Sequence, residues 1–83
     1  MTENEFELLD ELYFLTNIKD LINALEWSFD KICHTLGILY DKGWIKIVDS
    51  LENEITNPDL LNNYQDYCFL ATKKGLMAHN LEG

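Results

Sequence analysis

Four side chains in this sequence have types that could bind a metal ion or act as nucleophiles: Cys33, His34, Cys68 and His79. Cys33 and His34 are adjacent, and adjacent positions on a helix point about 100° apart, so these two side chains would diverge. The chain has neither a C-x-x-C nor an H-x-x-x-H spacing, which are common arrangements of metal ligands. The sequence therefore predicts buried thiols and surface histidines, with no metal and no cofactor.

Catalytic arrangements are equally unsupported by the spacing. A nucleophile pair of Cys33 and His34 fails because neighbouring helical positions do not face each other. Asp10 and Glu11 fall on the polar side of a predicted helix, where no cleft is implied. The chain also has no glycine-rich phosphate loop. We therefore expect a protein that is not an enzyme.

Length and composition indicate one small domain. The chain has 83 residues, of which 47% are hydrophobic, and this is enough for one core and too little for two. No apolar run approaches the roughly 20 residues that span a bilayer. The acidic start, from Met1 to Glu5, is unlike the basic start of a signal peptide. We expect a single domain over residues 1–83, in a cytoplasmic protein with reduced thiols.

The apolar periodicity predicts three helices in the first half of the chain. Thr2 and Glu5 have capping-box spacing for a helix over about residues 3–15. Asn17 opens a short second helix, and Ser28 caps a third that ends before Gly43. Gly37 lies within this third helix, where it could allow close approach of a neighbour. The predicted helical core consists of Phe6, Leu9, Tyr13, Leu21, Ile32, Leu36 and Leu39.

The second half changes to a strand pattern. Residues 44–48 alternate and are rich in β-branched side chains, and residues 67–71 have the pattern of an antiparallel partner strand. This pairing would place Ile45, Ile47 and Phe69 against the helices. The loop between the strands, residues 49–66, contains a predicted helical turn over residues 57–64 with Pro58 at its first position. Thr72 is predicted to cap a short last helix that ends near Leu81.

This order resembles that of a winged helix-turn-helix domain. The segment from Leu36 to Ile45, with its Lys-Gly-Trp-Ile sequence, is similar to a recognition helix that passes into the first wing strand. The segment from Tyr67 to Leu76, with its Thr-Lys-Lys-Gly sequence, resembles the return strand and last helix of MarR- and PadR-like transcriptional regulators. The resemblance implies an α+β fold with a three-helix core, a two-stranded β-hairpin wing with a long acidic loop, and a short C-terminal helix. It does not fix the function, because this fold serves both DNA binding and protein contacts.

In the resembling family the third helix enters the major groove of DNA. The candidate contact surface on this helix consists of Lys31, His34, Thr35, Ile38 and Lys42. Its outward lysines are balanced by Asp30 and Asp41, and the whole chain has no arginine and a net charge of −9. Arginine provides the planar fork that grips phosphates and guanine edges, so its absence weakens the DNA hypothesis.

The long wing loop is still less suited to DNA. It carries five carboxylates and no basic residue, and these charges would repel a phosphate backbone. A loop that points away from DNA would avoid this repulsion. The apolar residues of the loop either fold back on the body or form an anchor for a partner, and the candidate wing contacts are Leu51, Ile55, Leu60 and Leu61.

Three functions remain open on the sequence alone. The first is a regulatory or protein-interaction module that binds DNA weakly on its own, the second is a DNA-binding regulator, and a remote third is an acidic mimic of nucleic acid. A protein partner is expected, and the chain is expected to be a monomer or a weak homodimer. The position of the lysines distinguishes the first two functions, because lysines gathered on one face would favour DNA: Lys31, Lys42, Lys46, Lys73 and Lys74.

Overall fold

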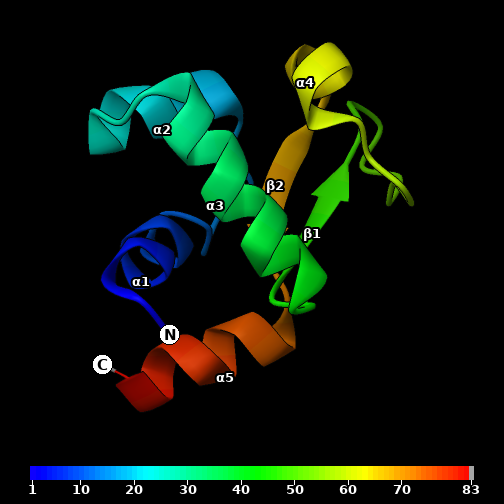
Figure 1. Cartoon of the computed structure of the whole chain (residues 1–83). Coiled ribbons are helices and arrows are strands. Elements are labelled where there is room, and N and C mark those ends of the chain that lie inside the picture. The colour runs from blue at the N-terminus through cyan, green and yellow to red at the C-terminus, as the bar shows by residue number, and fades with distance from the viewer. Residues whose placement is uncertain (83) are drawn as a thin grey trace.

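The computed structural model describes residues 1–82, without the side chain of Glu82, and contains the expected succession of helices and strands. Three helices precede a two-stranded antiparallel sheet, and a last helix follows it (Figure 1). The elements are α1 (Glu3–Asp10), α2 (Ile18–Leu25), α3 (Phe29–Asp41), β1 (Ile45–Val48), α4 (Leu60–Asn63), η1 (Tyr64–Asp66), β2 (Cys68–Ala71) and α5 (Lys73–Glu82). No helix within residues 1–82 combines the length and apolar character needed to cross a membrane.

Helix α1 is shorter than the periodicity predicts. It ends at Asp10 rather than near residue 15, because the backbone of the following segment forms hydrogen bonds with β2. The carbonyl of Leu12 accepts a 2.8 Å hydrogen bond from the amide of Ala71, and Thr16 exchanges backbone hydrogen bonds with Phe69. A continued helix could not make these contacts. The prediction that Tyr13 belongs to the core is consequently wrong, since its side chain is exposed.

The predicted caps of α2 and α3 are confirmed. The Asn17 side chain accepts a hydrogen bond from the amide of Asp20, and the Ser28 hydroxyl accepts one from the amide of Lys31. Gly43 follows α3 with a φ of 75°, the left-handed conformation that glycine adopts without strain. Local sequence therefore sets the beginnings of α2 and α3 and the end of α3.

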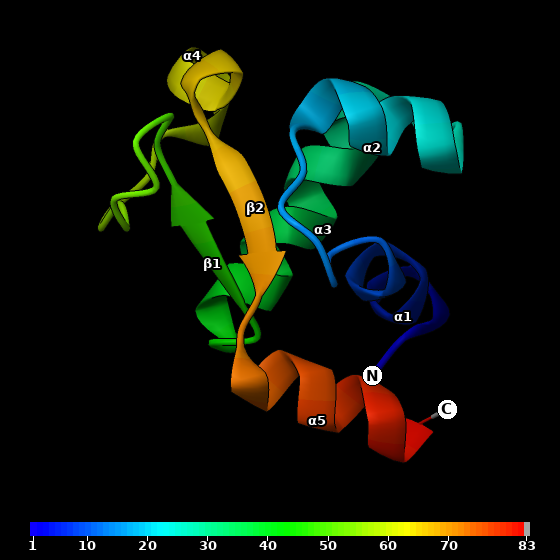
Figure 2. The same ribbon diagram turned by 180° about the vertical axis from the view of Figure 1, so that it is seen from behind.

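The sheet also follows the prediction. Ile45 pairs with Ala71 and Ile47 with Phe69, and Ile45, Ile47 and Phe69 are all buried. Figure 2 shows the two strands beside α3, against which β1 packs. Five of the seven residues predicted for the helical core are buried, whereas Phe6 is half-buried and Tyr13 exposed. The buried hydrophobic cluster comprises Leu8, Leu9, Leu12, Ile18, Leu21, Ile32, Cys33, Leu36, Leu39, Ile45, Ile47, Tyr67, Phe69 and Ala71.

Helix α5 is joined to the start of the wing by a tight backbone contact. The Thr72 hydroxyl accepts from the amide of Gly75, which confirms the predicted cap, and donates to the carbonyl of Gly43 at 2.7 Å. A Cβ on Gly75 would lie 2.0 Å from the carbonyl oxygen of Trp44, so only glycine fits there. Gly37 is different, because a Cβ there would meet no atom within 4 Å. The prediction that Gly37 allows close approach of a helix is therefore wrong.

The helical turn in the wing begins later than predicted. It starts at Leu60, and Asp59 caps it by accepting from the amide of Asn62. Pro58 thus precedes the turn rather than opening it. The amide of Asp59 donates to the Tyr67 hydroxyl at 3.0 Å, and this bond attaches the start of the turn to the residue that precedes β2.

Candidate functional site

The candidate recognition surface on α3 is only partly exposed. Lys31, His34 and Lys42 are exposed and Ile38 is half-buried. Thr35 is buried, and its hydroxyl donates to the carbonyl of Lys31 at 2.9 Å. The expectation that Thr35 faces outward is wrong, because the core covers a wider face of α3 than the apolar stripe alone indicates.

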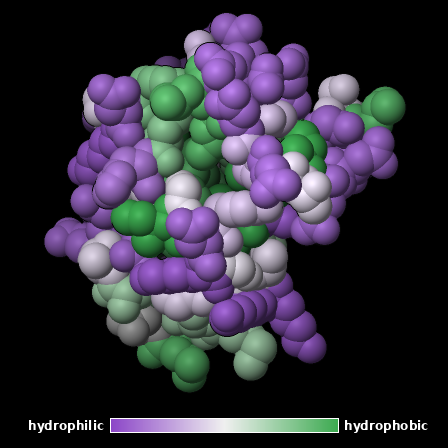
Figure 3. Space-filling view, turned by 45° about the vertical axis from the view of Figure 1, so that its right-hand side comes forward, coloured by the Kyte–Doolittle hydropathy of each residue, from purple (hydrophilic) through white to green (hydrophobic). Residues whose placement is uncertain are grey.

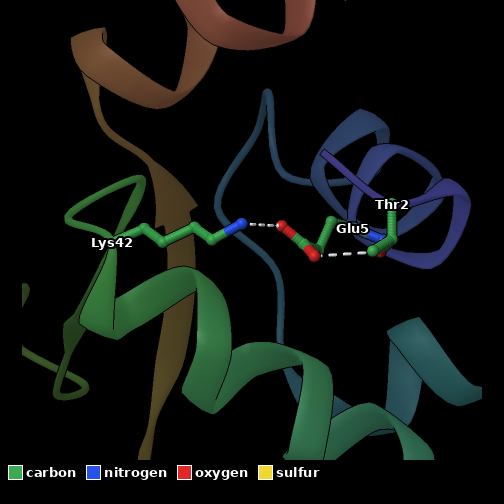
Figure 4. A network of polar contacts seen from close by, with 3 residues as sticks. All are labelled: Thr2, Glu5 and Lys42. Carbon is green, nitrogen blue, oxygen red and sulfur yellow. Dashed lines mark hydrogen bonds and ion pairs between the residues drawn. The ribbon is translucent and has the colours of Figure 1, made fainter.

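The ammonium of Lys42 is held by an acidic residue of α1. It donates to the Glu5 carboxylate, which also accepts a 2.9 Å hydrogen bond from the Thr2 hydroxyl (Figure 4). The Glu5 side chain is only 5% exposed, whereas that of Lys42 is 39% exposed. Burial raises the pKa of Glu5, but the hydrogen bonds from Lys42 and Thr2 outweigh it and leave the pKa below its ordinary value. Glu5 therefore stays ionised and neutralises the lysine at the end of the candidate surface.

The lysines of α3 lie at its two ends. Lys31 is near the start, where its ammonium lies 4.1 Å from the centre of the Trp27 ring. Lys42 follows the helix, eleven positions further on, which corresponds to about 16 Å along the axis. The ammonium of Lys74 approaches Gly43, within 3.8 Å of where a Cβ would stand. Lys42 and Lys74 thus flank the turn after α3, whereas Lys31 lies apart from them.

The wing begins with a tight turn built by Asp49. One carboxylate oxygen of Asp49 accepts from the amides of Leu51 and Asn53, at 2.9 and 3.0 Å. The Asp49 amide donates to the Asn53 carbonyl, and Glu52 has a left-handed φ of 63°. The hydrogen bond from the Asn53 amide, with that from Leu51, lowers the pKa of Asp49 although desolvation opposes it. The turn therefore retains a negative charge and holds Leu51 at a fixed place.

The four candidate wing contacts divide into two pairs. Ile55 and Leu60 are half-buried against the core cluster, so they fold back on the body. Leu51 and Leu61 are 79% and 69% exposed. In Figure 3 the wing projects to the right as a mainly hydrophilic lobe with an apolar group at its outer end. Ile55 and Leu60 thus follow the first alternative that the sequence left open, whereas Leu51 and Leu61 remain on the surface.

The carboxylates of the wing lie around these leucines in the sequence. The wing has no lysine, arginine or histidine between its two strands that could offset them. Glu52, Glu54, Asp59 and Asp66 are exposed, and Asp49 is half-buried in its turn. The charged side chains of the wing between the two strands are therefore all acidic.

The four residues that could have formed a metal or nucleophile site do not come together. Cys33 is buried and His34 exposed on the same helix, and Cys68 is half-buried on β2. Burial, helped by the charge of Asp30, raises the pKa of Cys33, so its thiol stays protonated and unreactive. Among the side chains that the structure describes, no group of three or more histidines, cysteines or acidic residues is placed to hold a metal ion.

His79 is buried, contrary to the prediction of surface histidines. Its Nδ1 lies 2.7 Å from the Tyr13 hydroxyl, and its ring stacks on Phe6 with 4.1 Å between centroids. Its Nε2 lies 3.5 Å from a carboxylate oxygen of Asp10 and makes no hydrogen bond to a described residue. The cluster joins α1 and the following loop to α5. No local pattern indicates it, because Tyr13 and His79 are 66 positions apart.

Comparison with known proteins identifies the fold. No family model and no curated protein matches the sequence. A solved structure described as Multiple Antibiotic Resistance Repressor, MarR, matches with a TM-score of 0.74 and 18% sequence identity. The match covers 98% of this chain and 53% of the MarR chain, so this chain spans about half the length of that protein. The expected fold is thereby confirmed: the chain has a winged helix-turn-helix fold that resembles MarR.

Proposed function

We propose that this chain is a regulatory winged-helix module that acts through protein contacts and binds DNA only weakly on its own. The observation that carries the proposal is the ion pair of Lys42 with the buried Glu5 carboxylate. Lys42 stands at the end of the candidate recognition helix, where its ammonium would otherwise be able to contact a DNA phosphate. The ion pair with Glu5 occupies this ammonium. Affinity for DNA depends largely on cations that neutralise phosphates, so each lysine engaged within the protein reduces it.

The surface of the wing supports the same proposal. Leu51 and Leu61 are exposed on a segment whose charges are all negative. Exposed apolar side chains with a polar surround are typical of protein interfaces. The Asp49 turn holds Leu51 in place before a partner arrives, which reduces the entropy cost of binding.

A DNA-binding regulator of the winged helix-turn-helix type is the second candidate. The observation in its favour is the likeness to MarR, a repressor by its description, over nearly the whole chain. Lys42 and Lys74 also flank one turn, where a small basic area could meet a phosphate. The separation of Lys31 from this area favours the first candidate.

A salt-dependent titration with random-sequence duplex DNA distinguishes the candidates. If the chain acts mainly through protein contacts, its dissociation constant for DNA at physiological salt should be larger than about 10⁻⁴ M and should change little with salt. Micromolar binding that weakens steeply with salt would establish the DNA-binding regulator instead. A Glu5→Gln, Lys42→Gln double variant provides the internal comparison, because it removes the lysine without leaving a buried unpaired carboxylate. If Lys42 does not contact DNA, this double variant should bind DNA about as weakly as the wild type.

The contact role of the wing is tested separately by affinity capture. Wild type and a Leu51→Ser, Leu61→Ser double variant are compared against the same lysate. Met77→Ser on α5 is the matched control, because Met77 is also an exposed apolar residue, at 57%. Bands lost with the wing variant and retained with the control support the wing as the interface, and bands unaffected by the wing variant count against it.

A further inference from the structure

An apolar groove lies between α2 and the end of the wing, and neither Leu51 nor Leu61 lines it. Two hollows of about 250 and 320 Å³ share Ile18, Lys19 and Tyr64 as lining residues. The larger hollow also includes Ile22 and Phe29. The rings of Phe29 and Tyr64 are tilted by 60°, with centroids 4.6 Å apart, so helix α3 and the wing together form an aromatic wall.

The charge that lines the groove is positive. Lys19 is its only charged lining residue, and the other polar residues are the amides Asn17, Asn23 and Gln65. Lys19 is exposed and forms no ion pair with any described residue, in contrast to Lys42. No carboxylate lines either hollow, on a protein whose net charge is −9. The groove therefore combines an apolar surface with an available cation.

We propose that this α2–wing groove binds the carboxy-terminal residue of a partner protein, with an apolar last side chain. The side chain lies against Ile18, Ile22 and the Phe29–Tyr64 wall, and the terminal carboxylate pairs with the ammonium of Lys19. The amides provide donors and acceptors for the peptide groups that precede this residue. This proposal rests on the proposed function, because it specifies the chemistry of one protein contact.

Charge and shape select this occupant over two others. An acidic segment would be repelled by the net charge of −9, whereas one terminal carboxylate matches the one lysine. A free apolar acid would be poorly enclosed, since both hollows are open to solvent and small-molecule sites bury about 70–90% of their ligand. The last residue of a peptide can bind in such an open hollow with one side of its side chain against the protein. The residues that precede it would lie along the rim of the groove.

The test is an NMR titration of the ¹⁵N-labelled protein with an acetylated glycine–serine hexapeptide that ends in leucine. We expect saturable shifts at the amides of α2, Phe29 and Tyr64–Gln65, with a dissociation constant of about 1 mM. Amidation of the peptide terminus should weaken binding about tenfold, because a charge-assisted hydrogen bond is lost. Lys19→Gln should weaken it similarly, and Lys19→Arg should retain it.

The matched control is Lys73→Gln, which removes an exposed lysine of α5 and lowers the net charge equally. Equal weakening by Lys73→Gln would overturn the proposal, as would tight binding of the amidated peptide or no saturation at about 10 mM. Equal affinity for free 4-methylpentanoate would also overturn it, because the site would then take a small acid. Failure of these peptides leaves the DNA titration and the wing capture unaffected, so the two proposals can fail separately.

Discussion

The carboxylate of Glu5 on α1 accepts a hydrogen bond from the ammonium of Lys42, the residue that caps the end of α3. The two residues are 37 positions apart in the sequence. The pair links the first helix to the end of the third. It also places a charged group in a position that is 5% exposed, at the edge of the hydrophobic core. A buried carboxylate is tolerated only where its charge is paired and hydrogen-bonded, and Lys42 and Thr2 meet both needs.

Glu5 should make the fold sensitive to acid. Its pKa is below the ordinary value of 4.5 in the folded chain, so it stabilises the fold above that value. The contribution is lost as the pH falls below 4.5 and passes through the lower folded pKa. We expect Glu5→Gln to cost about 1–2 kcal/mol at neutral pH and to reduce the further loss below pH 4.5.

Urea unfolding at a series of pH values measures this effect. Glu7→Gln is the matched control, because Glu7 is exposed on the same helix and the substitution changes the net charge equally. The interpretation fails if the Glu5 and Glu7 variants have the same pH profile.

Substitution by alanine should change the stability of the fold in opposite directions at Gly75 in α5 and at Gly37 in α3. At Gly75 the new methyl group would meet the carbonyl of Trp44 at 2.0 Å, and backbone would have to move. We expect Gly75→Ala to destabilise the fold by about 2–4 kcal/mol. At Gly37 the methyl group meets nothing within 4 Å, and alanine should stabilise α3 by about 1 kcal/mol. Thermal unfolding of both variants checks the pair, and equal effects would contradict it.

Sequence reasoning succeeded where the determining contacts are local. The caps Thr2, Asn17 and Ser28 each bond an amide three positions away, so spacing alone reveals them. The two strands and their buried face follow from alternation, which places Ile45 and Ile47 on the same side of the first strand.

It failed where distant segments decide. The end of α1 is set by the bond from Ala71 to Leu12, which no periodicity within α1 records. The burial of Thr35 depends on which helices cover α3, and Thr35 can be buried because its hydroxyl bonds within its own helix. Lys19 lines the candidate groove only because Tyr64, far along the chain, folds against α2, and no pattern within α2 records this.

The two thiols should differ in reactivity. Cys33 is 9% exposed in the core cluster, and its pKa is raised by burial and by the charge of Asp30. Cys68 is half-buried on β2. We expect iodoacetamide to modify Cys68 first, with Cys33 reacting on the timescale of unfolding. Mass spectrometry of time points follows both sites, and faster modification of Cys33 would show that its surroundings differ from those described.

The bond between Tyr13 and His79 should stabilise the joint between the α1–α2 loop and α5. The Tyr13 hydroxyl lies 2.7 Å from Nδ1 of His79 and donates to the Asn80 side chain at 3.1 Å. Tyr13→Phe removes both contacts while the ring remains edge-on to His79, so we expect a loss of about 0.5–1.5 kcal/mol. Tyr40→Phe is the matched control, because the hydroxyl of this half-buried tyrosine bonds no side chain or backbone group within residues 1–82. Chemical unfolding gives the free energies, and hydrogen exchange locates the loss, which should appear in the amides of α5. Equal destabilisation by both variants would mean that the hydroxyl of Tyr13 contributes nothing specific, and that stacking of Phe6 on His79 alone holds the joint.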